Sequence, residues 1–229
     1  CSICNKPFTE SNKKVRDHCH RTGKFRGAAH NSCNINYFNN RYLPCVFHNL
    51  RGYDSHLIIK KAFDIIETNK TINPNKKTKE TINAIPNSGE KFMTFSIGNI
   101  KFIDSFQFMS DSLDNLVESL KSSGSDPYQK FAHMKKHFKS DEMSLVCKKG
   151  VYPYEYIDSY SKLYEKQLPS KEKFYSNVKL EGITDEEYQH AQHVYDYFKC
   201  KDFSDYHFLY LKTDVILLAD VFENFRQLC

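Results

Sequence analysis

The chain has 229 residues and a mass of 26.9 kDa, enough for one large domain or for a domain with a small appendage. Hydrophobic residues make up 40% of it, and 18 Phe and 15 Tyr supply the apolar surface that disordered chains lack. No apolar run approaches the ~18 residues of a membrane span, and the first residue is a cysteine instead of a basic leader. The sequence predicts a folded protein with no membrane partner and no signal peptide, and a start without Met indicates a fragment.

The positive charge is concentrated near the first residue. Residues 1–41 hold eight Lys or Arg against two acidic residues, a net charge of +6, whereas the other 188 residues carry −1 of the overall +5. A basic segment of this kind is typical of a surface that contacts phosphates, so we expect DNA as a partner. A solvated basic loop is the alternative.

Two short metal-binding patterns lie in this basic segment. Cys1 and Cys4 form one pair and His30 and Cys33 a second, the arrangement that folds a short segment around a tetrahedral zinc ion. We therefore predict that these four side chains bind structural zinc. Four further cysteines, all beyond this basic segment, are too scattered for a disulfide framework, so we expect thiols in a reducing, intracellular compartment, nuclear or organellar. They are Cys45, Cys147, Cys200 and Cys229.

Asp17 and His18 lie between the two pairs, and Asn34 directly follows the last zinc ligand. In a nuclease built on a ββα-metal hairpin, Asp17 and Asn34 would hold a second divalent ion and His18 would deprotonate the attacking water. The alternative is a zinc-stabilised basic knob that grips DNA, with His18 and His20 orienting ligands or contacting phosphates.

Together with Gly23-Lys24-x-Arg26-Gly27, these residues resemble the endonuclease VII (HNH-type) zinc module. His30 stands where that family commonly has a cysteine ligand, which zinc tolerates. Cys19 interrupts the family's Asp-His-Asp-His pattern. We expect a small N-terminal zinc-binding ββα-type module over 1–41.

The rest of the chain mixes strand and helix patterns. We expect a buried strand within 42–50, a helix with one apolar face over 55–67, an exposed loop over 68–80, and a β-hairpin of 92–97 and 100–104 around Gly98-Asn99. Helices over 112–121 and 128–138 precede an irregular stretch over 147–183. A capping box from Thr184 to Glu187 then opens a helix, and a last, long helix starts at about Asp205 with Ser204 as its N-cap. This order predicts an α/β layered fold.

Two carboxylates stand where two-metal phosphodiester hydrolysis would need them, on separate elements that can converge. Asp54 follows the first strand and a turn. Asp214 lies four residues after Tyr210, so the phenol and the carboxylate share one helix face. Taken alone, the first pattern is usual for a helix cap and the second for a surface pair.

Residues 47–58 and 210–222 resemble the second and third motifs of the 3′-5′ exonuclease domain in protein-primed family B DNA polymerases of the organellar, viral and Polinton-transposon type. Residues 102–106 and 148–153 are also similar to that group, whose transposon-borne members carry an endonuclease VII-like insertion before the second motif. The resemblance implies an RNase H-like 3′-5′ exonuclease fold over 42–229.

The resemblance also implies roles for single residues. Asp54 and Asp214 would bind magnesium or manganese, and Tyr210 would orient the attacking water. A single-stranded DNA 3′ end would be held by hydrogen bonds and stacking, and Lys148 or Lys149 would contact the scissile phosphate. Phe106 stands where the family has Leu. The DNA-binding residues so implied are His48, Asn49, Tyr53, Ser105, Phe106, Lys148 and Lys149.

The family's first motif, an Asp-x-Glu on a preceding strand, has no counterpart in this sequence. We therefore expect an incomplete exonuclease fold whose first strand is missing. The palm carboxylates of polymerisation are absent too, so the chain as given should neither polymerise nor proofread efficiently.

Three functions are open. The preferred one is a fragment of a protein-primed, DNA-directed DNA polymerase, a nucleotidyltransferase of DNA replication, covering its proofreading region. The partners would then be a template-primer, a single-stranded 3′ end and a terminal protein. The others are a zinc-dependent HNH endonuclease and a non-catalytic DNA-binding remnant of a mobile element.

Overall fold

The computed structural model describes residues 1–19, 22–37, 42–52, 54–72, 81–86 and 92–229, and the chain divides into two compact units. The first unit comprises Cys1–Cys45 and Asp54–Ile103, and the second comprises Val46–Tyr53 and Asp104–Cys229. Helices and strands occur together, so the predicted α/β class is confirmed. The finer RNase H-like assignment stays a prediction.

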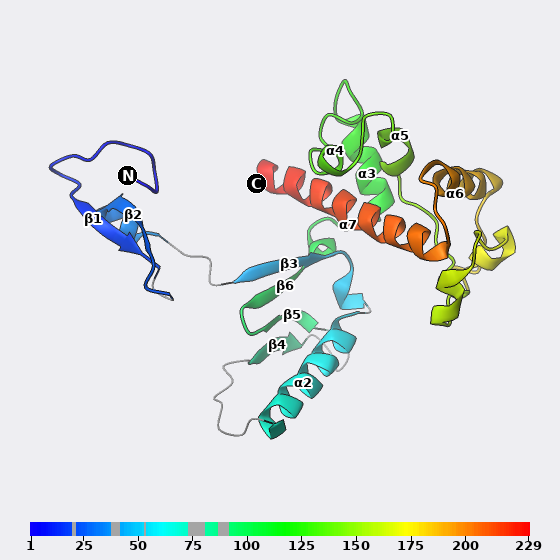
Figure 1. Ribbon diagram of the computed structural model, residues 1–229, viewed down its shortest axis with the longest axis horizontal. Helices are drawn as coiled ribbons and strands as arrows, with labels where there is room; N and C mark the ends of the chain where they lie inside the picture. The colour runs from blue at the N-terminus through cyan, green and yellow to red at the C-terminus, as the bar shows by residue number, and fades with distance from the viewer. Residues whose placement is uncertain (20–21, 38–41, 53, 73–80, 87–91) are drawn as a thin grey trace. The chain divides into compact units, whose positions relative to one another are not determined.

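A β-hairpin and one short helix form the N-terminal module, in the ββα order that the sequence predicted. The strands β1 (Lys14–His18) and β2 (Phe25–His30) pair antiparallel, and α1 (Asn31–Ile35) packs against both (Figure 1). Gly27 in β2 has a φ of 150°, and a Cβ there would lie 2.8 Å from the Cβ of Ser2. A side chain at this position would push the N-terminal segment off the hairpin.

Four strands form a second sheet, in the order β3-β6-β5-β4. The predicted hairpin is confirmed, because β5 and β6 pair antiparallel and Gly98 between them has the left-handed φ of 57°. Phe95 and Phe102 lie opposite each other and stack, with ring centroids 4.3 Å apart. The strands are β3 (Leu43–Phe47), β4 (Ile82–Pro86), β5 (Phe92–Ile97) and β6 (Ile100–Asp104).

The sequence did not predict β4. Its residues, Ile-Asn-Ala-Ile-Pro, do not alternate between apolar and polar side chains, and four of the five are exposed in the structure. The helix α2 (Asp54–Ile72) packs against β4 and β5 and contains the predicted helix. It runs past the expected start of a loop at residue 68. Thr68 and Thr71 fit the helix because their hydroxyls donate to the carbonyls of residues 64 and 67, at 2.7 and 3.0 Å. Residues 73–80 lie outside the described residues.

Helices and short turns make up the second unit (Figure 1). Its largest core lies where α7 meets α3 and α4, and it includes the buried side chains of Val117, Phe131, Met134 and Leu217. The helices are α3 (Leu113–Ser122), α4 (Met134–His137), α5 (Met143–Val146), α6 (Asp185–Tyr197) and α7 (Phe203–Leu228). The 3₁₀ turns are η1 (Leu50–Gly52), η2 (Ser105–Gln107), η3 (Tyr160–Tyr164) and η4 (Lys171–Phe174).

The helix predicted over 128–138 is wrong, because only the single turn of α4 forms there. The Asp220 carboxylate, 1% exposed, accepts the backbone N–H groups of His133 at 2.8 Å and Met134 at 2.9 Å. It also bonds to Nδ1 of His133 at 2.9 Å. These N–H groups therefore cannot continue a helix from the preceding turn, and a new helix begins at Met134.

The irregular stretch over 147–183 and the capping box of Thr184 and Glu187 are confirmed. Ser204 as the N-cap of the last helix is wrong. The helix begins at Phe203, and Asp202 caps it by accepting the N–H of Asp205.

Among the described residues, no helix combines the length and the apolar character needed to cross a membrane.

Candidate functional site

The four predicted zinc ligands come together in the N-terminal module, with their ligand atoms all within 4.8 Å of one another. Nε2 of His30 bonds to the carbonyl oxygen of Pro7 at 2.8 Å. Since a carbonyl only accepts, Nε2 carries the proton and Nδ1 keeps the lone pair that a metal needs. This Nδ1 lies 3.4 Å from Sγ of Cys4 and 3.7 Å from Sγ of Cys33. The group could hold zinc through Cys1, Cys4, His30 and Cys33.

Asp17 is paired with an arginine inside the same module. Its carboxylate, 2% exposed, accepts from Nε of Arg26 at 3.0 Å and from Nη2 at 2.6 Å, and this pair lowers the pKa of Asp17. The Arg26 guanidinium also lies 4.2 Å from the ring centroid of Tyr37. His18 is exposed at the end of β1, and Asn34 is half-buried in α1. The second metal site of Asp17, His18 and Asn34 stays a prediction.

A phenol and a carboxylate one helical turn apart mark a candidate site on α7. The Tyr210 hydroxyl lies 2.6 Å from that of Tyr154. Oδ1 of Asp214 is buried and has no hydrogen-bond partner among the described residues. Burial raises the pKa of Asp214, while the Lys149 charge and hydrogen bonding with Tyr210 lower it. Buried polar atoms usually have partners, so this oxygen is the kind of atom that a bound cation would satisfy.

Neighbouring groups fix the Tyr210 ring in place. The ring centroid of Tyr152 lies 4.9 Å away, and the Tyr152 hydroxyl bonds to Nδ1 of His207 at 2.7 Å. A Cβ on Gly150 would lie 3.2 Å from Cδ2 of Tyr210, so this glycine leaves room for the ring. The sequence analysis included Tyr152 in the 148–153 motif without giving it a role, and it missed Tyr154. The available signal was the Tyr152-Pro153-Tyr154 run that follows Gly150-Val151.

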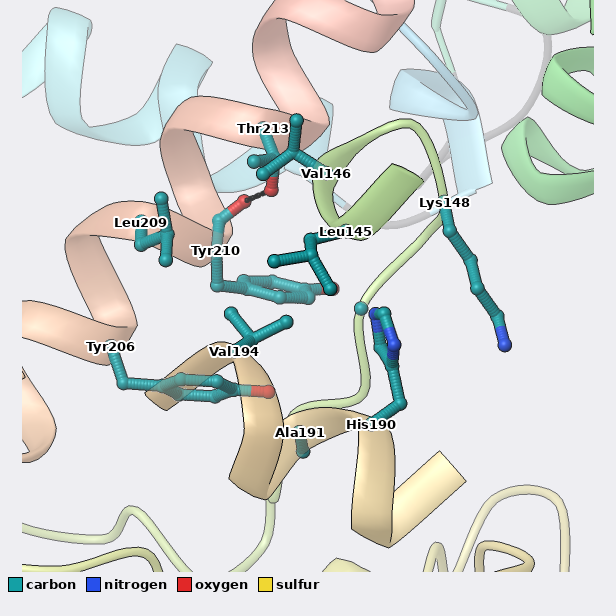
Figure 2. Close-up of a pocket in the computed structure, with 11 residues that line it drawn as sticks. Leu145, Val146, Lys148, His190, Ala191, Val194, Tyr206, Leu209, Tyr210 and Thr213 are labelled. Atoms are coloured by element: carbon teal, nitrogen blue, oxygen red, sulfur yellow. Dashed lines mark hydrogen bonds between the residues drawn. The ribbon is translucent and has the colours of Figure 1, made fainter. Parts of the chain in front are cut away.

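A cavity of about 20 Å³ lies beside the Tyr210 ring, and Figure 2 shows the side chains around it. Its volume suits about one water molecule and not a nucleotide. Lys148 and His190 line one side, and burial, followed by the Lys148 charge, lowers the pKa of His190. The two adjacent lysines therefore act on different groups, Lys148 on His190 and Lys149 on Asp214.

The loop after β3 gathers most of the predicted single-strand-binding residues. Nδ1 of His48 lies 2.9 Å from the Ser105 hydroxyl, and its ring meets the Phe106 ring edge-on, with centroids 5.4 Å apart. Asn49 is exposed and has a positive φ of 65°. The structure thus brings these four residues together. Tyr53 lies outside the described residues.

The two carboxylates predicted to share metal ions belong to different units. Asp54 is exposed at the first position of α2 in the first unit, and Asp214 lies in α7 of the second. Their joint action on a metal stays a prediction.

Comparison with protein-family models gives two matches. The model of DNA polymerase type B, organellar and viral, matches residues 34–229, and that of recombination endonuclease VII matches residues 1–49. Both agree with the resemblances seen in the sequence motifs. Comparison with curated proteins and with solved structures gives no match.

Replacing Cys33 by Ser should remove zinc from the chain and unfold its N-terminal module. One ligand of four is lost, and zinc binding supplies on the order of 10 kcal/mol of folding free energy in small zinc-dependent folds. We expect one zinc per chain in the unmodified protein and none in Cys33→Ser, measured by mass spectrometry of the dialysed protein. Cys229→Ser, an exposed thiol outside the cluster, should keep its zinc. Equal zinc content in both variants would contradict the assignment.

Replacing Asp214 by Asn should stabilise the chain at neutral pH. Burial raises the pKa of Asp214 in the folded state above its ordinary value of 3.8, so the folded state holds the proton more tightly. Stability therefore falls as the pH rises from about 3.8 through the folded pKa. Urea unfolding should show a gain on the order of 1 kcal/mol for Asp214→Asn at pH 7, shrinking toward zero as the pH is lowered to about 3.8.

The matched control is Asp196→Asn, an exposed carboxylate of α6, which should show no such gain. A loss of stability in Asp214→Asn at pH 7 would contradict the prediction, because it would mean that the contacts of the charged carboxylate outweigh the cost of its burial.

Proposed function

Because the chain belongs to the organellar and viral type B DNA polymerases, we propose that it forms part of their 3′-5′ exonuclease region and binds a single-stranded DNA 3′ end during replication. One observation carries this proposal. A buried oxygen of Asp214 lacks a partner beside a tyrosine whose hydroxyl is held in place. The zinc module over 1–41 and the exonuclease region over 42–229 would be its two domains.

Asp214 and Asp54 are the proposed ligands of magnesium or manganese. When bound, such a cation would neutralise charge on the phosphodiester and acidify the attacking water. The partnerless Oδ1 of Asp214 and its hard carboxylate chemistry suit this kind of ion. If a protein group donated a hydrogen bond to Oδ1 of Asp214, this oxygen would instead help to hold the fold together.

Tyr210 is proposed to orient the attacking water through its hydroxyl oxygen. Burial, followed by the Asp214 charge, raises its pKa, so the phenol keeps its proton and cannot act as a general base at neutral pH. The Tyr154 hydroxyl at 2.6 Å fixes the direction of the Tyr210 hydroxyl. Of the two adjacent lysines, we assign the scissile phosphate to Lys149, because its charge acts on Asp214.

The zinc module supports a second candidate role as a DNA grip. Lys14 and Arg16 lie over the rings of Phe8 and Phe25, at 5.8 and 5.4 Å from the ring centroids, and both rings are exposed. Exposed cations beside exposed rings suit phosphates and unstacked bases. The alternative is a zinc-dependent HNH endonuclease, which the endonuclease VII match supports. In it, His18 would act as the base, and Asp17 and Asn34 would be metal ligands.

The polymerase family suggests a template-primer and a terminal protein as partners, in the nucleus or an organelle.

Manganese binding tests the site on α7 without requiring turnover. In the zinc-loaded chain, Mn²⁺ titration followed by electron paramagnetic resonance should show a site that Asp214→Asn weakens at least about tenfold, since one ligand is lost. Tyr210→Phe should leave Mn²⁺ affinity unchanged, because the phenol is proposed to act on water and not on the cation. Asp196→Asn is the matched control. Unaltered Mn²⁺ affinity in Asp214→Asn would refute the proposed role of this carboxylate.

A further inference from the structure

The hydrogen bonds of His48 and Ser105 leave little for DNA to bind. Nδ1 of His48 bonds to the Ser105 hydroxyl at 2.9 Å, and Nε2 bonds to the carbonyl oxygen of Asp111 at 2.7 Å. Ser105 is 0% exposed, and its hydroxyl donates to the carbonyl of Phe47 at 2.8 Å. Both ring nitrogens of His48 and the hydroxyl of Ser105 are therefore engaged within the protein.

These bonds fix the orientation of the His48 ring. One ring nitrogen is bonded to a hydroxyl that donates onward to the Phe47 carbonyl, and the other is bonded to the Asp111 carbonyl, so turning the ring would break both bonds. The Asp111 carboxylate is held by the Asn115 side-chain amide and by the Ser112 N–H, each at 2.7 Å, and these bonds lower its pKa.

A third residue, Asp104 at the end of β6, holds the loop backbone. Its carboxylate, 6% exposed, accepts the N–H of Asn49 at 2.9 Å, of Arg51 at 3.0 Å and of Phe106 at 3.1 Å. Asn49 has a left-handed φ of 65°, a conformation that costs a non-glycine residue about 1 kcal/mol or more unless its surroundings hold it. A Cβ on Gly52 would lie 2.6 Å from Oδ1 of Asn49, so the loop closes tightly around this side chain.

From this network we infer that Asp104, Ser105 and His48 are positioning residues that present Asn49 and Phe106 to single-stranded DNA. Asn49 is exposed, and the Phe106 ring is 38% exposed against the edge of His48. Their amide and ring suit hydrogen bonding to and stacking on an unpaired base. The inference rests on the proposed function for its ligand, but the network can be tested without DNA.

Nuclear magnetic resonance tests the network alone. In the ¹⁵N-labelled chain, the backbone amides of Asn49, Arg51 and Phe106 should be protected from hydrogen exchange, because each donates to the Asp104 carboxylate. Asp104→Ala should abolish the hydrogen-exchange protection of the Asn49, Arg51 and Phe106 amides, and Glu186→Ala, an exposed carboxylate of α6, should not. Asp104→Asn keeps Oδ1 but turns an N–H₂ toward Arg51, so it should release that amide first and still fold. Unchanged protection in Asp104→Ala would overturn the inference.

Binding of a 5′-labelled oligothymidylate, followed by fluorescence anisotropy, tests the purpose of the network. Asn49→Ala and Phe106→Ala should each weaken oligonucleotide binding about tenfold, because each removes a direct contact with DNA. Both variants should keep the hydrogen-exchange protection of the loop amides. Asp104→Asn should weaken binding and protection together, and its effect on binding should vanish in the Asn49→Ala background. If Ser105→Ala weakens binding without altering protection, Ser105 touches DNA and the positioning role is wrong. If the unmodified chain does not bind the oligonucleotide, the proposed function fails, while the resonance measurements still decide the network.

Discussion

A carboxylate removed from water must find donors or a cation, and this constraint organises the chain. Asp17 is satisfied by Arg26, Asp104 by three backbone N–H groups, and Asp220 by His133 and Met134. Each of these carboxylates holds a local structure together. Asp214 differs, because its buried Oδ1 has no donor among the described residues. The same physical rule thus distinguishes three carboxylates that have donors within the protein from one whose buried oxygen suits a cation.

The helix α7 combines both kinds of carboxylate. Asp220 is buried and fixes the start of α4, while Tyr210 and Asp214 lie earlier on the helix, where the Tyr210 hydroxyl meets that of Tyr154 and the Lys149 charge acts on Asp214. The bonds of Asp220 and the apolar core stabilise α7, so the helix can tolerate the free-energy cost of leaving Oδ1 of Asp214 without a donor. Preorganised sites commonly lower the stability of the fold in this way.

Periodicity and spacing predicted what depends on local sequence. The β5-β6 hairpin follows from Gly98, the start of α6 from its capping box, and the zinc cluster from two paired motifs. Tertiary contacts decided the rest. The helix expected over 128–138 is cut short by Asp220, which lies far along the chain, and β4 carries no alternating pattern. Tyr154 was missed because only the folded chain brings its hydroxyl to Tyr210.

The most direct test is a crystal structure of the zinc-loaded chain with Mn²⁺, with data collected at the manganese absorption edge. The account predicts an anomalous peak at bonding distance from Oδ1 of Asp214, within the range of about 2.0–2.6 Å that oxygen ligands keep from divalent cations of this kind. A protein donor or an ordered water bonded to Oδ1, with no anomalous peak at saturating Mn²⁺, would contradict the central claim.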